Sequence, residues 1–493
     1  MPTTEQQPGG VIEYQPAPAD PDPYVLTQDA IADPPATLGR ALRQVGPGLI
    51  LAGAIVGTGE LIATTNLGAK VGFALLWLVI VSCFIKVFVQ IELGRYAISS
   101  GQTTMASFRE LPGPGGVIGW WWVVMMLVTQ LQLGAMIGGI GQALHMAVPA
   151  VAHQVAWWVG QVHAGWGTYL AGRPEIPWAI LATLGTVAVL ARGSYALVEK
   201  GTTFMVAIFT LMTVACVALL PASGHPIPWA EVGHGLTFDI PPGAILAALA
   251  MFGITGVGAA ELVAYPYWCI EKGYASRTGP RDDSAAWLAR ARGWMRVMRL
   301  DAWVSFAVYT VGTIAFYFLG AAVLHRGDGA GLPQTIGSML DRLAGMYAPV
   351  MGVAGSRWFI VIGVLAVLYS TLFASTGANS RALVDFLKVN RFLRLDRPGA
   401  RKRSVRLWCV IFPVVDLLLF IWIGSPLAMV IVGGVAQALT LPMLGTAAVY
   451  LRYKRTDRRL TPGKAWDVFL WLSVAGFTLA AGVGLWEQVK KVM

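Results

Sequence analysis

The chain has 493 residues, of which 56% are apolar and 13% are charged, and its formal net charge is +10 at pH 7. Soluble domains carry roughly a quarter charged residues, so this balance excludes an ordinary soluble protein and indicates one that crosses a membrane many times. In such a chain the basic excess marks orientation in the membrane. We therefore expect the lipid bilayer, and no nucleic acid, as a partner.

The first 40 residues are rich in proline and acidic residues and contain no Lys or Arg before Arg40. A signal peptide needs a basic segment followed by an apolar one, so none is predicted here. This composition is typical of disordered segments. We expect residues 1–40 to be a disordered cytoplasmic tail and residues 41–493 to form one transmembrane domain.

Apolar runs fill most of the remaining chain, and about 20 apolar residues are enough to cross a bilayer as a helix. Eleven spans are predicted, at residues 47–70, 72–99, 117–147, 177–191, 196–220, 241–271, 297–324, 356–385, 405–423, 426–451 and 465–488. The fold class is therefore an all-α polytopic membrane protein.

Basic residues gather in alternate loops between these spans. The loops at 272–299, 388–406 and 452–464 are rich in Lys and Arg, whereas the loop at 221–240 contains neither. Because basic loops stay on the cytoplasmic side, the alternation predicts a cytoplasmic N-terminus and an external C-terminus. The membrane would be the cell's inner (plasma) membrane.

An octapeptide occurs twice, in the first and sixth predicted spans. Residues 56–63 read Val-Gly-Thr-Gly-Glu-Leu-Ile-Ala and residues 257–264 read Val-Gly-Ala-Ala-Glu-Leu-Val-Ala. Paired spans that small residues interrupt at corresponding places indicate the binding site of a secondary transporter built from repeats. We predict that the two spans are broken at Gly57–Gly59 and Gly258–Ala260.

Each copy carries one carboxylate near the middle of its span, Glu60 or Glu261. In two repeats related by a pseudo-two-fold axis, both should approach the same midplane cavity. Carboxylates and the freed carbonyls of broken helices suit a hard cation. The predicted substrate-binding residues are Gly57, Thr58, Gly59, Glu60, Gly258, Ala259, Ala260 and Glu261, with Glu60 and Glu261 as metal ligands. The alternative is that each Glu caps the half-helix that follows it.

Other charges also fall inside predicted spans. Lys86 lies midway along the second span, where an unpaired ammonium would cost about 2.5–3.5 kcal/mol. We expect it to pair with one of the two Glu side chains or with Asp301. The alternative is a cation that replaces a coupling ion or titrates during transport. Asp301 and Asp416 lie nearer to span ends, so we expect them to be solvated or paired with Arg299 or Arg406.

With eleven spans and this repeat, the chain resembles the Nramp metal-ion transporters, from about Gly46 to about residue 488. The most specific stretch runs from Gly46-Pro47-Gly48 to Gly101, and Ser370-Thr371-Leu372 and Leu441-Pro442 add support. The resemblance implies a leucine-transporter-type fold with helices 1 and 6 broken, repeats at about 47–220 and 241–451, and an extra helix at about 465–488. It also implies a transporter and not an enzyme. We expect no cofactor and a monomer.

The departures from the family lie in the binding site. Where the family has Asp-Pro-Gly-Asn, this chain has Gly57-Thr58-Gly59-Glu60, and Met-Pro-His is replaced by Ala260-Glu261-Leu262. The acidic pair linked to proton movement in the family corresponds to Gln130 and Leu133. Loss of the thioether disfavours soft metals. The Nramp-related magnesium transporters also lack this methionine, and the chain is similar to that branch.

These features together predict a secondary transporter for a hard, partly hydrated divalent cation such as Mg²⁺ or Mn²⁺. Because Gln130 and Leu133 cannot relay protons, proton coupling by the family's route is not expected. Two alternatives stay open: transport of another solute, such as an organic cation, on the same fold, and a membrane sensor that has lost transport.

Overall fold

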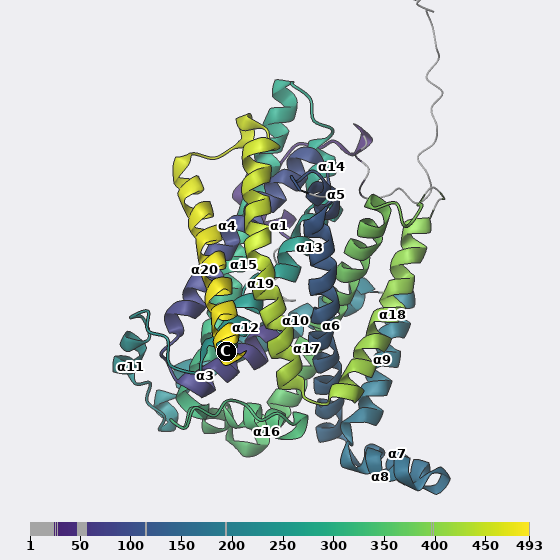
Figure 1. Ribbon diagram of the computed structural model, residues 1–493, viewed down its shortest axis with the longest axis vertical. Helices are drawn as coiled ribbons and strands as arrows, with labels where there is room; N and C mark the ends of the chain where they lie inside the picture. The colour runs from purple at the N-terminus through teal and green to yellow at the C-terminus, as the bar shows by residue number, and fades with distance from the viewer. Residues whose placement is uncertain are drawn as a thin grey trace, which may run out of the picture.

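The computed structural model describes residues 24, 26, 28–46, 57–113, 116–192, 195–395, 397 and 399–492, and for residues 195–203, 488, 491 and 492 it describes the backbone only. Within these residues the secondary structure is helical, without strands. Long helices run side by side as a bundle, and the short helices cover its two ends (Figure 1).

Nine elements of the described part are long and apolar enough to cross a membrane. They are α4 (Leu76–Ser100), α6 (Val117–Ala147), α9 (Glu175–Arg192), α12 with α13 (Ile245–Ile254, Ala259–Glu271), α15 with η4 (Ala285–Leu319, Gly320–Leu324), α17 (Ala348–Val389), α18 (Ala400–Ile423), α19 (Pro426–Lys454) and α20 (Lys464–Val492). A further helix, α10 (Tyr195–Leu219), coincides with the predicted fifth span. The all-α, multi-pass prediction is confirmed.

Short elements connect the long ones. They are η1 (Gln28–Ala30), α1 (Leu38–Gln44), η2 (Gly59–Thr64), α3 (Thr65–Val71), α5 (Thr104–Arg109), α7 (Pro149–Val162), α8 (Ala164–Gly172), η3 (Pro221–Ser223), α11 (Trp229–His234), α14 (Tyr274–Thr278), α16 (Ile336–Gly345) and η5 (Arg458–Leu460). The predicted loop at 272–299 is thus partly helical. Ser284 caps α15 by accepting a hydrogen bond from Trp287 N at 3.0 Å. The helix therefore begins at Ala285, before the apolar run that was predicted as the seventh span.

The first predicted span can be followed only in its second half. Residues 47–56 lie outside the described residues, and from Gly59 the chain forms the π-helical η2, which continues as α3. The residues of η2 are buried. A π-helical turn inside a span shifts backbone groups out of the regular α-helical hydrogen-bonding pattern. Such turns are frequent at functional sites.

The sixth span is broken, as predicted, but slightly earlier in the chain. Residues 255–258 separate α12 from α13, and Gly256 has φ of 63°, which a residue with a Cβ rarely adopts. The prediction placed Ala259 and Ala260 in the break, and this is wrong. Both belong to the first turn of α13, where alanine is a strong helix former.

The N-terminal prediction needs a correction too. Residues 1–23, 25 and 27 of the expected tail lie outside the described residues, but the rest packs on the bundle. Tyr24 donates a hydrogen bond to Glu271 Oε1 at 2.6 Å, and Trp294 Nε1 donates to Ala32 O at 2.9 Å. The end of the bundle with the basic loops therefore carries an ordered N-terminal segment.

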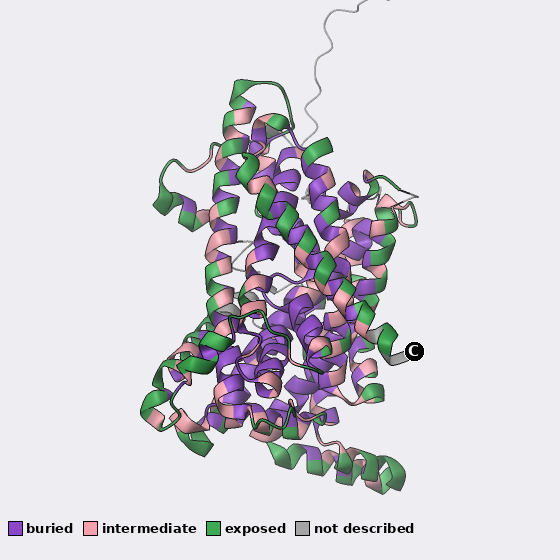
Figure 2. Cartoon of the chain, turned by 60° about the vertical axis from the view of Figure 1, so that its left-hand side comes forward, coloured by how far each residue is buried: buried purple, intermediate pink, exposed green. Residues whose placement is uncertain are grey.

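Helix α6 lies inside the bundle and packs against α9, α17, α18 and α19. Buried residues follow the interior of the bundle, and exposed ones cover its outer faces and the α7–α8 hairpin (Figure 2). Large apolar side chains such as Leu418 and Trp422 are exposed on α18. In a membrane protein such faces contact lipid.

Candidate substrate site

A small cavity lies beside the break between α12 and α13. It offers about 40 Å³ for the centres of water-sized molecules. Its walls come from Thr58 and Gly59 at the beginning of η2 and from α6, α12, α13, α17 and α19. A water needs at least about 10–15 Å³ of such space, so the cavity has room for a few waters or a small, partly hydrated ion.

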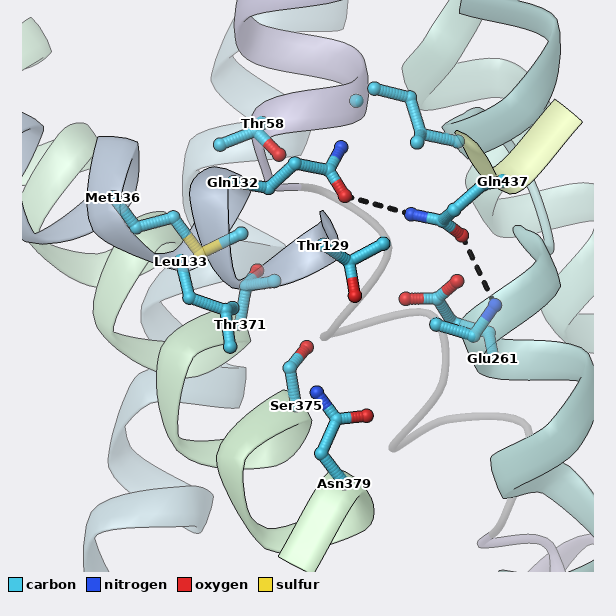
Figure 3. A pocket seen from close by; sticks show the side chains of 13 residues that line it. Thr58, Thr129, Gln132, Leu133, Met136, Glu261, Thr371, Ser375, Asn379 and Gln437 are labelled. Carbon is cyan, nitrogen blue, oxygen red and sulfur yellow. Dashed lines mark hydrogen bonds between the residues drawn. The ribbon is translucent and has the colours of Figure 1, made fainter. Parts of the chain in front are cut away.

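Glu261 supplies the cavity's carboxylate from the first turn of α13 (Figure 3). Its Oε2 atom is buried and has no hydrogen-bond partner within the described residues. This oxygen lies so close to Gly258 that a Cβ there would be 2.5 Å away. The glycine of the repeat thus makes room for the carboxylate, and the carboxylate keeps an acceptor free for a ligand.

Two glutamines hold the wall next to Glu261. Gln437 Oε1 accepts a hydrogen bond from Ala260 N at 3.1 Å, and Gln437 Nε2 donates to Gln132 Oε1 at 2.8 Å. This chain of amides links α13, α19 and α6 (Figure 3). Because Gln437 is engaged through both its oxygen and its nitrogen, the wall is fixed in place around the carboxylate.

The remaining polar wall comes from α6 and α17. Thr371, Ser375 and Asn379 line the cavity at intervals of four residues, so they share one face of α17. Thr129 faces them from α6, and its hydroxyl and that of Ser375 point into the cavity in Figure 3. These neutral oxygens can complete the coordination of a cation or contact its water.

The cavity also has an apolar side, made by Leu133 and Met136 of α6 and Ile254 of α12. The sequence prediction missed Met136 because it took substrate-binding residues only from the broken segments. It missed Thr129, Gln132, Asn379 and Gln437 for the same reason. A usable signal existed, since residues 129, 132, 133 and 136 repeat at helical spacing along one face of the third span.

Glu60 occupies a different place from its repeat partner. It is fully buried, and it is not among the residues that line the cavity. Its Oε1 accepts hydrogen bonds from Gly256 N at 3.3 Å and Thr313 Oγ1 at 3.2 Å, and its Oε2 accepts from Gly57 N at 3.5 Å. A Glu that reaches back to the amide three residues earlier is the pattern of a helix cap.

The other predicted site residues divide in the same way. Thr58, Gly59 and Ala260 line the cavity together with Glu261. Gly57, Gly258 and Ala259 do not line it, and the first two lie against the glutamate side chains. In this conformation the structure brings four of the eight predicted residues to one cavity.

The expectation of a carboxylate partner for Lys86 is not met. Its ammonium donates hydrogen bonds to Phe252 O and, at 2.7 Å, to Thr255 O. No ion pair of Lys86 is found among the described residues. The break leaves the last carbonyls of α12 without helical partners, and a cation is stabilised at that negative end.

Asp301 and Asp416 are both completely buried, so the expectation that they are solvated is wrong. Asp301 accepts hydrogen bonds from Gly46 N at 2.9 Å and Tyr265 OH at 3.0 Å. Asp416 Oδ1 accepts one from Gln130 Nε2 at 3.1 Å. Of the two third-span positions singled out from the sequence, Leu133 lines the cavity and Gln130 lies behind its wall.

In the part of the chain that the structure describes, no group of three or more His, Cys, Asp or Glu side chains could hold a metal ion. The cavity therefore presents a single carboxylate surrounded by hydroxyl and carboxamide groups, with one thioether on its wall. Such a site can neutralise one positive charge, and its neutral oxygens can bind the cation or its water.

Comparisons with known proteins agree with this architecture. The sequence model described as natural resistance-associated macrophage protein-like (Nramp) matches residues 48–487. A crystal structure of a manganese transporter from Eremococcus coleocola has a TM-score of 0.63 at 15% identity, and the match covers 94% of this chain and 92% of that one. No curated protein matches the chain.

More distant structures show the same fold. Mhp1, a nucleobase-cation-symport-1 family transporter, has a TM-score of 0.54 at 16% identity and covers 90% of both chains. MhsT in complex with L-phenylalanine has a TM-score of 0.52 at 17% identity, with 92% of this chain and 99% of that one covered. The arrangement of helices is the leucine-transporter type, and the family match extends over most of the sequence. The chain thus belongs to the Nramp-like family of membrane transporters and is not an enzyme.

Proposed function

We propose that this protein is a secondary transporter that carries a divalent metal cation, and that the cation binds in the cavity beside the α12–α13 break. One observation carries the proposal: a buried oxygen of Glu261, without a hydrogen-bond partner among the described residues, faces a cavity of hydroxyl and carboxamide groups beside a helix break. Broken helices at the midplane are where such transporters bind substrate. The family match and the manganese transporter with the same fold support a metal as the substrate.

The donor set favours a hard cation that keeps part of its water. A single carboxylate cannot neutralise a bare divalent ion, but Mg²⁺ and Mn²⁺ bind well through one carboxylate, neutral oxygens and retained water. The small volume also favours an inorganic ion over a large organic one. Mg²⁺ and Mn²⁺ are thus the two substrates that we propose.

A small organic ammonium ion is a second candidate. The observation in its favour is the charge balance, because one carboxylate matches one positive charge and the described residues include no cluster of three metal-binding side chains. Neutral hydroxyl and amide groups would accept the ammonium hydrogens. The small size of the cavity favours a substrate of only a few heavy atoms.

The orientation, the repeats and the oligomeric state are also part of the proposal. The alternating basic loops support a plasma-membrane protein with a cytoplasmic N-terminus. Repeats at about 47–220 and 241–451, an extra helix at 465–488 and a monomeric assembly follow from the family resemblance. Accessibility of single introduced cysteines to an impermeant thiol reagent, in a variant without the four native cysteines, would test the orientation.

Uptake into proteoliposomes tests the function. We expect uptake of Mg²⁺ or Mn²⁺ by the unmodified protein, unchanged by Asp341→Asn on the exposed side of α16. Glu261→Gln should reduce uptake about 30-fold or more, because it removes about 2 kcal/mol of charge-assisted binding. Uptake of methylammonium without uptake of either metal would favour the second candidate. Uptake that survives Glu261→Gln would place the site elsewhere.

A further inference from the structure

One buried carboxyl group has no role in the site described above. Asp416 lies on the side of α18 that packs against α6, and it is completely buried. Its Oδ1 accepts the hydrogen bond from Gln130, whereas its Oδ2 is buried without a partner among the described residues. The two helices touch here, since a Cβ on Gly134 would lie 2.7 Å from Asp416 O. The backbone contact leaves little room for a compensating side chain.

No charged group of the described residues compensates Asp416. Its helix, α18, packs against α6, α9 and α17, and the group that meets Asp416 from α6 is the neutral carboxamide of Gln130. The charged side chains of α9 and α17 lie toward the helix ends, and two of them have partners there: Glu175 pairs with Arg173 at 3.2 Å and Arg381 with Glu271 at 3.1 Å. Burial of an ionised carboxylate without a counter-charge is unfavourable, so such a group takes up a proton.

A chain of hydrogen bonds connects Asp416 to the cavity. Asn379, which lines the cavity, donates from Nδ2 to Gln130 Oε1 at 3.4 Å, and Gln130 donates from Nε2 to Asp416 Oδ1 at 3.1 Å. Both bonds point in the same direction, from the cavity to the carboxyl group. Hydrogen bonds aligned in this way polarise one another.

The alignment has a consequence for a bound cation. A cation that contacts Asn379 Oδ1 withdraws electrons from that amide, which makes Nδ2 a stronger donor to Gln130. Gln130 in turn becomes a stronger donor to Asp416. Stronger donation to a carboxyl oxygen favours its ionised form. The positive charge of the cation acts through space in the same sense.

We propose that Asp416 is a proton-binding site that empties when a cation enters the cavity. The O–H bond of the carboxyl group breaks, the proton passes to bulk water and the carboxylate stays hydrogen-bonded to Gln130. The proton on Asp416 and the cation at Glu261 therefore oppose each other. This inference rests on the proposed cation site, and it gives α18 a part in proton coupling although Gln130 itself cannot relay a proton.

Calorimetric titration of the purified protein with Mn²⁺ or Mg²⁺ in two buffers of different ionisation enthalpy counts the protons released per cation. We expect release from the unmodified protein and from Asp341→Asn, an exposed carboxylate on α16. In Asp416→Asn the number released should fall by roughly half or more while the cation still binds. Equal release from Asp416→Asn and the unmodified protein would overturn the proposal.

Infrared difference spectroscopy gives a second readout that does not depend on that variant. The unmodified protein should show the carbonyl band of a protonated carboxyl group, and saturating cation should remove it. In Gln130→Leu, which leaves the cavity-lining side chains intact, the band should persist when the cation binds. Absence of the band before cation addition, or its persistence at saturation in the unmodified protein, would refute the assignment. If no cation binds at all, the proposed function fails, but the band still reports the protonated group.

Discussion

The two copies of the repeated octapeptide place the same residue, Glu60 or Glu261, in opposite situations. Glu60 accepts hydrogen bonds from two backbone amides and one hydroxyl, whereas Oε2 of Glu261 has no partner within the described residues and faces the cavity. The local sequence alone does not account for this difference, since five of the eight residues, including the glutamate, are identical in the two copies. The neighbouring helices do, because α15 supplies Thr313 to one glutamate and α19 supplies Gln437 to the wall beside the other. A carboxylate whose oxygens all accept hydrogen bonds stabilises the fold, and one with an oxygen that accepts none is available to a ligand.

Replacing each glutamate by glutamine tests most directly whether the two side chains have different roles. Glu261→Gln should weaken cation binding about 30-fold or more, corresponding to about 2 kcal/mol, and leave the melting temperature nearly unchanged. Glu60→Gln should have the larger effect on stability and the smaller effect on cation affinity. The glutamine places an amide donor against backbone N–H groups, which costs about 1–3 kcal/mol of stability.

Calorimetric binding and thermal unfolding of both variants in detergent provide the measurements. The comparison fails if Glu60→Gln abolishes binding at unchanged stability, because Glu60 would then be a ligand in a conformation different from this one.

Lys86 offers the next test, since it belongs to the same junction as Glu60. Its two carbonyl partners at the end of α12 would lose their donor in Lys86→Met. The expected cost is about 1–3 kcal/mol for the unsatisfied carbonyls, and hydrogen exchange should increase at the end of α12. Thermal unfolding and exchange followed by mass spectrometry measure both effects. A variant that keeps its stability but loses transport would instead support a coupling role for this ammonium.

A variant of Met136 tests whether oxygen or sulfur atoms bind the cation in the cavity. Leucine has a similar volume, so Met136→Leu should cost less than about 1.5 kcal/mol of stability. If oxygen atoms bind the cation, competition by Cd²⁺ against Mg²⁺ or Mn²⁺ should change by less than about threefold, because the thioether is then only a wall. Competition assays on proteoliposomes measure this ratio. A tenfold loss of Cd²⁺ competition would identify the sulfur as a ligand.

The sequence allowed the fold and the break in the sixth span to be predicted because both depend on local patterns. Apolar runs marked the spans, and small residues with one carboxylate marked Glu60 and Glu261. The different roles of these residues could not be read in the same way. They depend on which amides and hydroxyls arrive from distant helices, as Gln437 and Thr313 do, and no spacing in the chain records those contacts. Lys86 shows the same limit, since its partners are backbone carbonyls that exist only once α12 ends.

A carboxylate outside the membrane, Asp457, can be compared with Glu60, because both of its oxygens also accept hydrogen bonds. Asp457, in the loop between α19 and α20, accepts hydrogen bonds from Arg459 N at 2.9 Å and Arg459 Nη2 at 2.8 Å and pairs with Arg281 at 3.0 Å. The hydrogen bonds from the Arg459 side chain, followed by its backbone N–H and the charge of Arg281, lower the pKa of Asp457 from 3.8 to about 2.

A carboxyl group with a depressed pKa stabilises the folded state above its unfolded value. That contribution is lost as pH falls from about 4 through about 2. Because both arginines are partly exposed and screened by solvent, we expect Asp457→Asn to cost at most about 1 kcal/mol at neutral pH. The difference in melting temperature between this variant and the unmodified protein should shrink as the pH is lowered through that window. If the difference were constant with pH, the loop would be held by the shape of the side chain and not by its charge, and Asp457 would no longer serve as the charged reference for Glu60.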